Sequence, residues 1–189
     1  MAERSPTLTV ALLLVGVYLV EFSLALLGTG PGVFALTTPV LARPWTLVTS
    51  VYAHYGLGHL FANLVGLLVV GFVLERRTSP ARFHAFFLAT GVVAGLAQVW
   101  VSDLFGPPSA VLGASGAIFG LVGYVLAGNR VADSVLSHLP LSAEAQLVVF
   151  AVVAAGLTLL TSGPRVALVA HFTGLLIGLL TGRAHLLRE

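Results

Sequence analysis

The chain has 189 residues, of which 58% are hydrophobic and only 8% are charged, and its mean hydropathy is +1.03. Because about a quarter of the residues in a soluble domain are charged, this composition excludes a water-soluble globular fold and indicates a membrane protein. The absence of cysteine excludes disulfides and thiolate chemistry, and the nine basic residues, all arginine, form no stripe that would bind nucleic acid.

Six apolar segments are candidate transmembrane helices, each of which needs about 20 residues to cross the hydrocarbon. The first is too long for the core of a signal peptide, so we expect it to be retained. No linker or internal repeat divides the chain, and we predict one all-α polytopic membrane domain covering residues 1–189. The predicted helices lie at residues 7–27, 57–74, 82–101, 111–128, 144–161 and 166–182.

The arginines predict the orientation, because cytoplasmic loops near helix ends accumulate positive charge. With a cytoplasmic N-terminus, the outer side receives only Arg43 and Arg165. We therefore predict that both termini are cytoplasmic and that Trp45 and Trp100 lie at the outer interface, where aromatic rings prefer to sit. The arginines on the cytoplasmic side are then Arg4, Arg76, Arg77, Arg82, Arg130, Arg183 and Arg188.

The connections between the helices differ in character. Residues 28–56 form the longest and include apolar clusters, so we expect this loop to pack on the bundle or dip into the interface. At residues 102–110, the sequence Gly106-Pro107-Pro108 ends one helix before the next begins. Residues 130–143, with Pro140, are expected to form a cytoplasmic connection.

A few strongly polar residues lie inside the predicted helices, where such side chains are costly and mark function. At a rise of 1.5 Å per residue, His59 lies about 5 Å and Asn63 about 10 Å below the outer end of their helix. Ser115 and His171 each lie about 8 Å below the outer ends of theirs. Three helices thus bring four polar residues into one slab of the outer leaflet. Glu21 also belongs to this polar set, and Gln98 and His54 lie closer to the edges of the helices.

Glycines four residues apart predict which helices touch, because small residues let two backbones approach closely. One such series begins beside Ser115 and another beside His171. Packing of the two helices along these faces would bring the serine and the histidine within hydrogen-bond reach. The glycines are Gly116 and Gly120 in the first helix and Gly174, Gly178 and Gly182 in the second.

This arrangement suits nucleophilic acyl transfer, in which His171 accepts the proton of the Ser115 hydroxyl and later returns it to the leaving amine. His59, Asn63 and the backbone N–H of Ser115 are candidates for stabilising the oxyanion. Nothing aims Glu21 at His171, so we predict a dyad without an acid and interpret Glu21 as an anchor for the long loop through backbone N–H groups. Gln98 is expected to form a local hydrogen bond.

Three motifs resemble those of the rhomboid intramembrane serine proteases. Gly113-Ala114-Ser115-Gly116 is similar to the family's GxSG, residues His59 to Asn63 to its HxxxN, and residues Ala170 to Gly174 to its AHxxG. They occur in the family's order, on the corresponding helices. The resemblance implies a compact six-helix bundle with a water-filled cavity open to the outer side. It also implies that a substrate helix enters laterally, near the helix at residues 144–161.

Site roles follow from the resemblance. It implies that Ser115 is the nucleophile, His171 its base, and His59 and Asn63 the oxyanion pair, while His54 is structural. Phe119 stands where many members have a tyrosine that stacks on the catalytic histidine. Gly113 and Gly116 make room around the serine. The family's first loop pairs a tryptophan with a following arginine, whereas here Arg43 precedes Trp45.

The predicted function is that of an intramembrane serine endopeptidase that cleaves single-span membrane proteins in the lipid bilayer. An alternative is a catalytically inactive rhomboid-like protein that binds membrane helices; such proteins generally lack the serine or the histidine, and this chain has both. A transporter or metal-binding protein using His59, His171 and Glu21 is disfavoured, because the spacing does not suit a metal site and there is no inverted repeat. We expect no cofactor or metal. Arginine without lysine indicates a GC-rich genome and hence a prokaryotic cell membrane.

Overall fold

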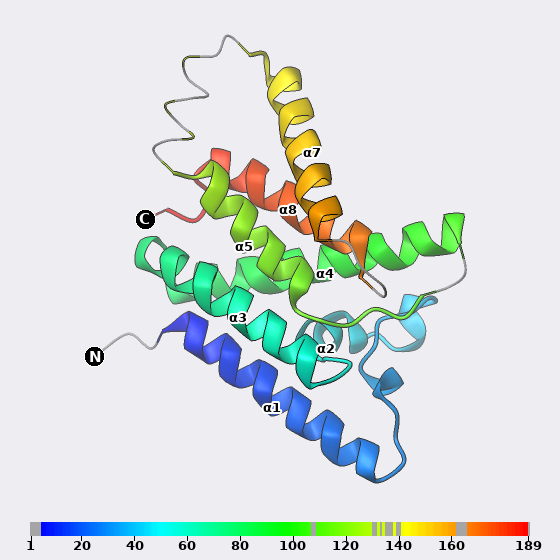
Figure 1. Cartoon of the computed structure of the whole chain (residues 1–189). Helices are drawn as coiled ribbons and strands as arrows, with labels where there is room; N and C mark the ends of the chain where they lie inside the picture. Colours follow the sequence, from blue (N-terminus) through cyan, green and yellow to red (C-terminus); the bar gives the residue numbers. More distant parts are fainter. Residues whose placement is uncertain are drawn as a thin grey trace.

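The computed structural model describes residues 5–106, 109–129, 132, 134, 138, 141–161 and 166–188. In this part of the chain the regular elements are helices, which confirms the all-α prediction, and one isolated β-bridge accompanies them. Figure 1 shows α1 and α7 at opposite edges of the bundle, with α5 and α8 side by side between them. The α-helices are α1 (Pro6–Leu26), α2 (Thr46–Tyr52), α3 (Leu57–Leu74), α4 (Pro80–Phe105), α5 (Ser115–Ala127), α7 (Ala143–Leu160) and α8 (Leu168–Arg183). The 3-10 helices are η1 (Pro31–Val33), η2 (Val40–Ala42) and η3 (Glu75–Arg77).

The six predicted membrane segments correspond to α1, α3, α4, α5, α7 and α8. Among the described residues, α1, α3 with η3, α4 and α7 are long and apolar enough to cross a membrane. The helices α5 and α8 have 13 and 16 residues, about 20 and 24 Å, which is less than the hydrocarbon thickness of about 30 Å. Each of these two helices therefore has at least one end below the membrane surface.

The start of α5 differs from the prediction. The helix begins at Ser115 rather than at residue 111, because the preceding residues are held in an extended conformation. Leu36 and Val111 exchange both backbone hydrogen bonds at 2.9 Å, and the Gly113 N–H donates to the Ser50 carbonyl at 2.8 Å. The predicted helix start at residue 111 is therefore wrong, because Ser115 is the first helical residue. The depth of Ser115 in the membrane, which was counted from that start, stays a prediction.

The long loop at residues 28–56 packs on the bundle, as expected. Leu36 is fully buried, and α2, which the sequence did not predict, packs against α4. The Arg43 guanidinium donates to the Gly32 carbonyl and, at 2.9 Å, to the Thr37 hydroxyl. The Trp45 indole N–H donates to the carbonyl of Val33 at 3.1 Å. These hydrogen bonds close the loop on itself, so Arg43 has a structural role although it precedes the tryptophan.

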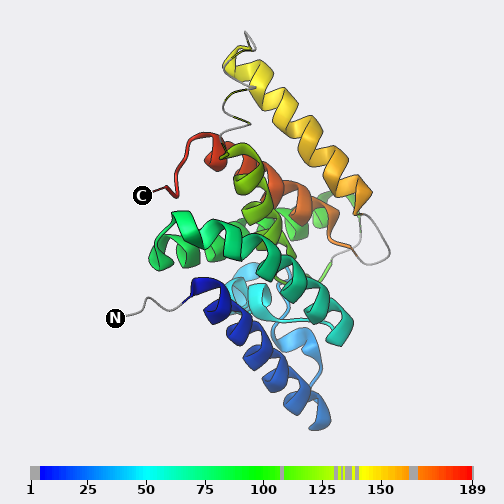
Figure 2. The same ribbon diagram turned by 60° about the vertical axis from the view of Figure 1, so that its left-hand side comes forward.

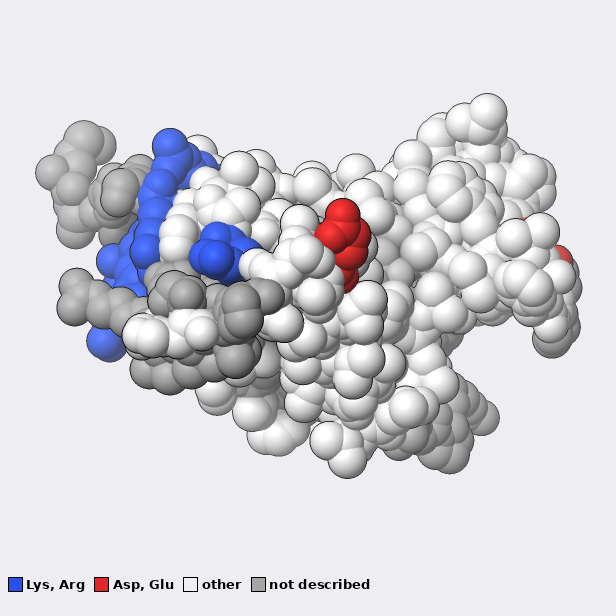
Figure 3. Space-filling model, turned by 90° about the horizontal axis from the view of Figure 1, so that it is seen from above, with Lys and Arg blue, Asp and Glu red and all other residues white. Residues whose placement is uncertain are grey.

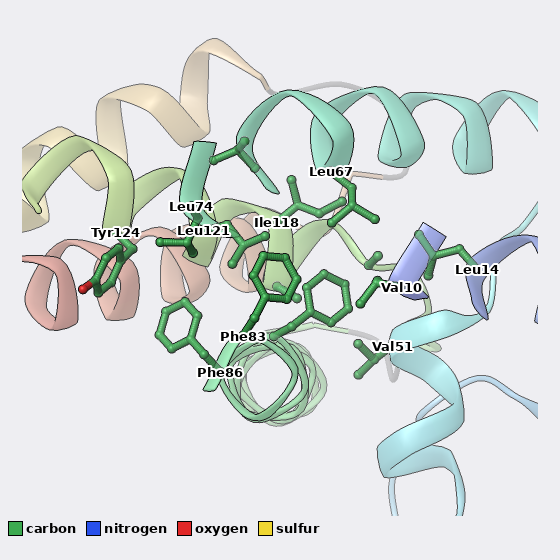
Figure 4. Close-up of a cluster of buried hydrophobic side chains, with 14 of the residues drawn as sticks. Val10, Leu14, Val51, Leu67, Leu74, Phe83, Phe86, Ile118, Leu121 and Tyr124 are labelled. Carbon is green, nitrogen blue, oxygen red and sulfur yellow. The ribbon is translucent and has the colours of Figure 1, made fainter. Parts of the chain in front are cut away.

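The main hydrophobic core lies between α1, α3, α4 and α5 (Figure 4). Phe83 and Phe87 of α4 are its largest fully buried side chains, and they pack among residues of the other three helices. By contrast, α7 buries only Phe150, Ala154 and Thr158 among its residues and rests on α8. Figure 2 shows this helix at the edge of the bundle, away from α1. Most of its other apolar side chains are exposed, as expected of a helix face that meets lipid.

One end of the bundle carries hydrogen bonds between the ends of several helices. The hydroxyl of Ser5, which precedes α1, donates to the Glu75 carboxylate at 2.7 Å. Arg82 at the start of α4 donates to the carbonyl of Arg188 at 2.7 Å, and Arg188 donates to the carbonyl of Gly128 after α5 at 2.6 Å. The start of α1 and the end of α8 therefore lie at the same end, as an even number of membrane crossings requires.

The described arginines of the predicted cytoplasmic set belong to this same end, and Figure 3 shows arginine side chains gathered at one end of the molecule. Arg4, Arg130 and Arg165 lie outside the described residues, as do Pro107, Pro108 and Pro140. Which end faces the cytoplasm therefore stays a prediction. The same holds for the placing of Trp45 and Trp100, whose side chains are about half exposed, at 50% and 54%.

Candidate active site

The backbones of α5 and α8 are in direct contact along the glycine faces, which confirms that prediction. A β-carbon added at Gly174 would overlap the carbonyl of Gly116, and one at Gly178 would overlap the carbonyl of Gly120. The contact recurs every four residues, as two closely packed helices require. Because the series starts beside Ser115 on α5 and beside His171 on α8, it sets the relative height of these two residues.

The ring of His171 lies on the first turns of α5. It stacks on Phe119 with ring centroids 4.3 Å apart and planes inclined by 15°. Phe119 follows Ser115 by four residues and so occupies the same face of the helix. His171 is buried and Ser115 half-buried, and within the described residues no hydrogen bond joins the two side chains. Serine–histidine contacts are often long before a substrate is bound, and tighten in its complex.

No acid completes a triad among the described residues. The Nδ1 atom of His171 is buried without a hydrogen-bond partner. The Glu21 carboxylate instead accepts the backbone N–H of His54 at 2.9 Å, at the end of the long loop. The interpretation of Glu21 as a loop anchor is therefore confirmed, and the dyad of Ser115 and His171 stays a prediction.

The helix α3 brings His59 against the backbone that precedes the serine. A β-carbon on Gly113 would lie 2.6 Å from Cε1 of His59, so only glycine leaves room for the imidazole there. The φ angle of Gly113 is +128°, a conformation that other residues rarely adopt. The helix α5 packs against α3 on one side and against α8 on another. The three helices α3, α5 and α8 thus converge around Ser115.

Asn63 lies one turn further along α3 and is buried, with 5% of its surface exposed. Its side-chain amide donates to the carbonyl of His59 at 2.9 Å. An amide nitrogen carries two hydrogens, so the second remains available as a donor. The pair predicted from the sequence therefore shares one helix face, with Asn63 tied to the backbone of His59.

His54 supports His59 from the loop before α3. The two rings meet edge to face, with centroids 5.0 Å apart. Burial lowers the pKa of His54 to about 4, so its ring is neutral at pH 7. Its Nδ1 lies 3.0 Å from the carbonyl of Tyr52, which can only accept, and therefore Nδ1 carries the proton. His54 is thus held as one tautomer beside His59, in a structural position.

Ser115 occupies the first turn of α5, and this position adds backbone donors to the site. Ala114 is the N-cap residue and makes no side-chain capping hydrogen bond. The N–H groups of a first helical turn have no partner within the helix, and they carry the positive end of its dipole. The serine hydroxyl therefore lies beside backbone N–H groups suited to bind a developing negative charge.

Two features of the site were missed by the sequence analysis. The segment before Ser115 is tied to the long loop, in part by the Tyr55 hydroxyl, which donates to the carbonyl of Ala110 at 2.8 Å. Gln98 makes the expected local hydrogen bond to Ser102, but it also accepts from the backbone of α8. The available signal was a glutamine within the otherwise apolar stretch of residues 91–101. The described residues hold no group of three His, Asp or Glu side chains that could bind a metal ion.

The fold and the site define a polytopic, all-helical membrane protein with a serine–histidine site where three helices meet. Residues 41–188 match the family model of the Rhomboid domain. The chain therefore belongs to the rhomboid family.

Several curated relatives are similar to this chain. The Rhomboid protease GluP of Bacillus subtilis is 42% identical over 90 residues, which cover 46% of this chain and 17% of that protein. RHOMBOID-like protein 5 of Arabidopsis thaliana is 32% identical over 144 residues, or 76% of this chain and 45% of that protein. The Inactive RHOMBOID-like protein 8 of the same plant is 37% identical over 83 residues, or 43% and 22%. The chain covers less than half the length of each of these relatives.

Proposed function

We propose that this protein is an intramembrane serine endopeptidase that cleaves the transmembrane segments of single-span membrane proteins in the outer half of the bilayer. Ser115 is the nucleophile and His171 its base. The observation that supports this most strongly is the stacking of His171 on Phe119, one turn from Ser115, between two helices whose backbones touch. A packing role alone would not require a buried imidazole at this point of α8.

The proposed reaction is acyl transfer in two steps. The Ser115 hydroxyl attacks the carbonyl carbon of the scissile peptide bond while His171 takes its proton. The oxyanion is stabilised by the Ser115 N–H, the His59 ring and the Asn63 amide. As the tetrahedral intermediate collapses, His171 gives the proton to the leaving amine. Water then hydrolyses the ester on Ser115, with His171 again acting as the base.

The second candidate is a catalytically inactive protein that binds membrane helices without cutting them. It is favoured by the similarity to a relative that is itself named inactive. Against it stands the presence of both Ser115 and His171 in this chain. For the cellular location, we propose a prokaryotic cell membrane. The relatives do not decide this, because they come from a bacterium and from plant and human sources. The observation that favours it is the use of arginine without lysine.

The test is covalent labelling of the purified protein in detergent with a fluorophosphonate, which reacts only with an activated serine. We expect the unchanged protein to be labelled and Ser115→Ala and His171→Ala to remain unlabelled. The same three proteins are then incubated with a single-span substrate reconstituted in liposomes, and cleavage is followed by gel. A failure of the unchanged protein to react in both assays would favour the inactive alternative, and cleavage by Ser115→Ala would overturn the assignment of the nucleophile.

A further inference from the structure

The first turn of α8, which carries His171, is capped from another helix. The N-cap residue of α8, Ala167, offers no side-chain hydrogen bond to the turn. The Oε1 atom of Gln98, on α4, instead accepts the backbone N–H groups of Val169 at 3.0 Å and Ala170 at 3.2 Å. A residue 71 positions earlier in the chain thus replaces the missing cap.

The side-chain amide of Gln98 is held in one orientation. Its Nε2 atom donates to the Ser102 hydroxyl at 3.0 Å, one turn further along α4. The backbone N–H groups of Val169 and Ala170 can only donate, so Oε1 faces α8 and Nε2 is left to donate to Ser102. An unpaired backbone N–H is costly where the surroundings are apolar, so these two donors need the Gln98 acceptor.

The cap acts on the residue next to the base. Ala170, whose N–H binds Gln98, directly precedes His171, and the same helix is pressed against α5 at Gly174. The α4 helix also touches α5 one turn before Gln98, where a β-carbon on Gly116 would lie 2.7 Å from that of Ala94. The helices α4, α5 and α8 therefore contact one another in pairs, and together these contacts fix the distance between Ser115 and His171. The hydrogen bonds of Gln98 form part of the contact between α4 and α8.

We propose that Gln98 is a positioning residue for His171: by capping α8 from α4, it holds the imidazole at the height and angle at which it can take the proton of Ser115. This role rests on the proposed function. Gln98 itself touches neither the substrate nor the reacting atoms. Losing the acceptor frees the first turn of α8 to shift, and a displacement of about 1 Å can cost a hundredfold in rate.

The experiment measures the second-order rate constant of fluorophosphonate labelling, per folded protein, as a function of pH. Gln98→Leu removes the acceptor, and we expect the rate constant to fall about ten- to a hundredfold and the pH midpoint to move. Gln98→Glu keeps an acceptor oxygen in either protonation state, and we expect it to stay within about threefold of the unchanged protein. The matched control is Gln146→Leu, which removes a glutamine that also contacts α8, through Arg183 at the other end of that helix.

A purely structural role predicts a lower yield or melting temperature, with an unchanged rate constant and pH midpoint in the folded fraction. That result for Gln98→Leu would overturn the proposal. If Gln98→Leu does not fold, Gln98→Asn decides, because it shortens the amide by one methylene with little change in volume; labelling at the unchanged rate and midpoint would again overturn it. An unchanged protein that is not labelled at all overturns the proposed function and this inference with it, so the two failures are distinguishable.

Discussion

At the scale of single residues, an aromatic ring packs on one face of the His171 imidazole, and the Nδ1 atom of the imidazole has no hydrogen-bond partner among the described residues. Phe119 provides a flat apolar surface at 4.3 Å, which limits the ring to rotation in its own plane. A tyrosine would offer the same surface with an added hydroxyl. In the proposed mechanism, this stacking orients His171 in the way that the acid orients the histidine of a triad.

The first prediction concerns this surface. We expect Phe119→Leu to lower the labelling rate constant about two- to tenfold, because an aromatic pair contributes roughly 0.5–1.5 kcal/mol beyond its buried area. Phe119→Tyr keeps the ring and should react within about twofold of the unchanged protein. The measurement is the fluorophosphonate rate constant at a single pH. Equal rates for the leucine and tyrosine variants would show that the stacking does not orient the base.

The second prediction concerns Gly113. Alanine there would meet the His59 ring 2.6 Å from its Cε1 atom and would have to adopt a φ angle of +128°. We expect Gly113→Ala to lower cleavage of a single-span substrate by about a hundredfold or more, because the oxyanion donors are displaced. The matched control is Gly58→Ala, next to His59, where an added β-carbon meets nothing within 4 Å. Equal loss in both variants would contradict this account of Gly113.

At the scale of helices and loops, the sequence predicts the membrane helices and one of the contacts between them, but not the contacts between distant segments of the chain. The long apolar runs predict α1, α3, α4 and α7, and the glycine spacing predicts which faces of α5 and α8 meet. The extended segment before Ser115 could not be predicted, because it depends on the pairing of Val111 with Leu36, far away in the chain. The same reason applies to Gln98, whose partners lie on α8. Local sequence patterns predict single helices, whereas the contacts of Val111 and Gln98 depend on how distant segments of the chain pack together.

The third prediction concerns the contact between α5 and α8. Gly178→Ala places a methyl group against the carbonyl of Gly120, and the two helices must separate. We expect the free energy of unfolding to fall by about 1–3 kcal/mol, as is typical of overpacking. Thermal unfolding in detergent measures the change. Gly156→Ala on α7, where nothing lies within 4 Å of the added β-carbon, serves as the control and should leave the melting temperature nearly unchanged.

At the scale of the whole molecule, the charges divide the bundle into two unlike ends. Arg76, Arg77 and Arg82 are exposed at the end where the α1 and α8 termini lie, whereas the end with the long loop carries Arg43, engaged in that loop. Anionic lipid and the insertion machinery both favour arginine on the cytoplasmic side. We therefore predict that the end with these arginines faces the cytoplasm and that the end with the long loop and the candidate site faces the outside.

The fourth prediction tests this orientation. The chain has no cysteine, so single substitutions can be labelled without background. We expect Leu41→Cys, at a position 87% exposed in the long loop, to react with a membrane-impermeant maleimide added outside sealed right-side-out vesicles. Arg77→Cys should react only after the vesicles are opened with detergent. The reverse pattern would invert the proposed topology and move the site to the inner half of the bilayer.

The order of the two proposed reacting residues along the chain has a consequence for biosynthesis. Ser115 stands at the start of α5, and His171, with the backbone that Gln98 caps, belongs to α8. While α1 to α7 enter the membrane from the ribosome, the nascent chain carries a serine that no base activates. In the proposed mechanism, Ser115 and His171 come together only when α8 packs against the glycine face of α5. The protein therefore cannot cleave neighbouring nascent chains before this step.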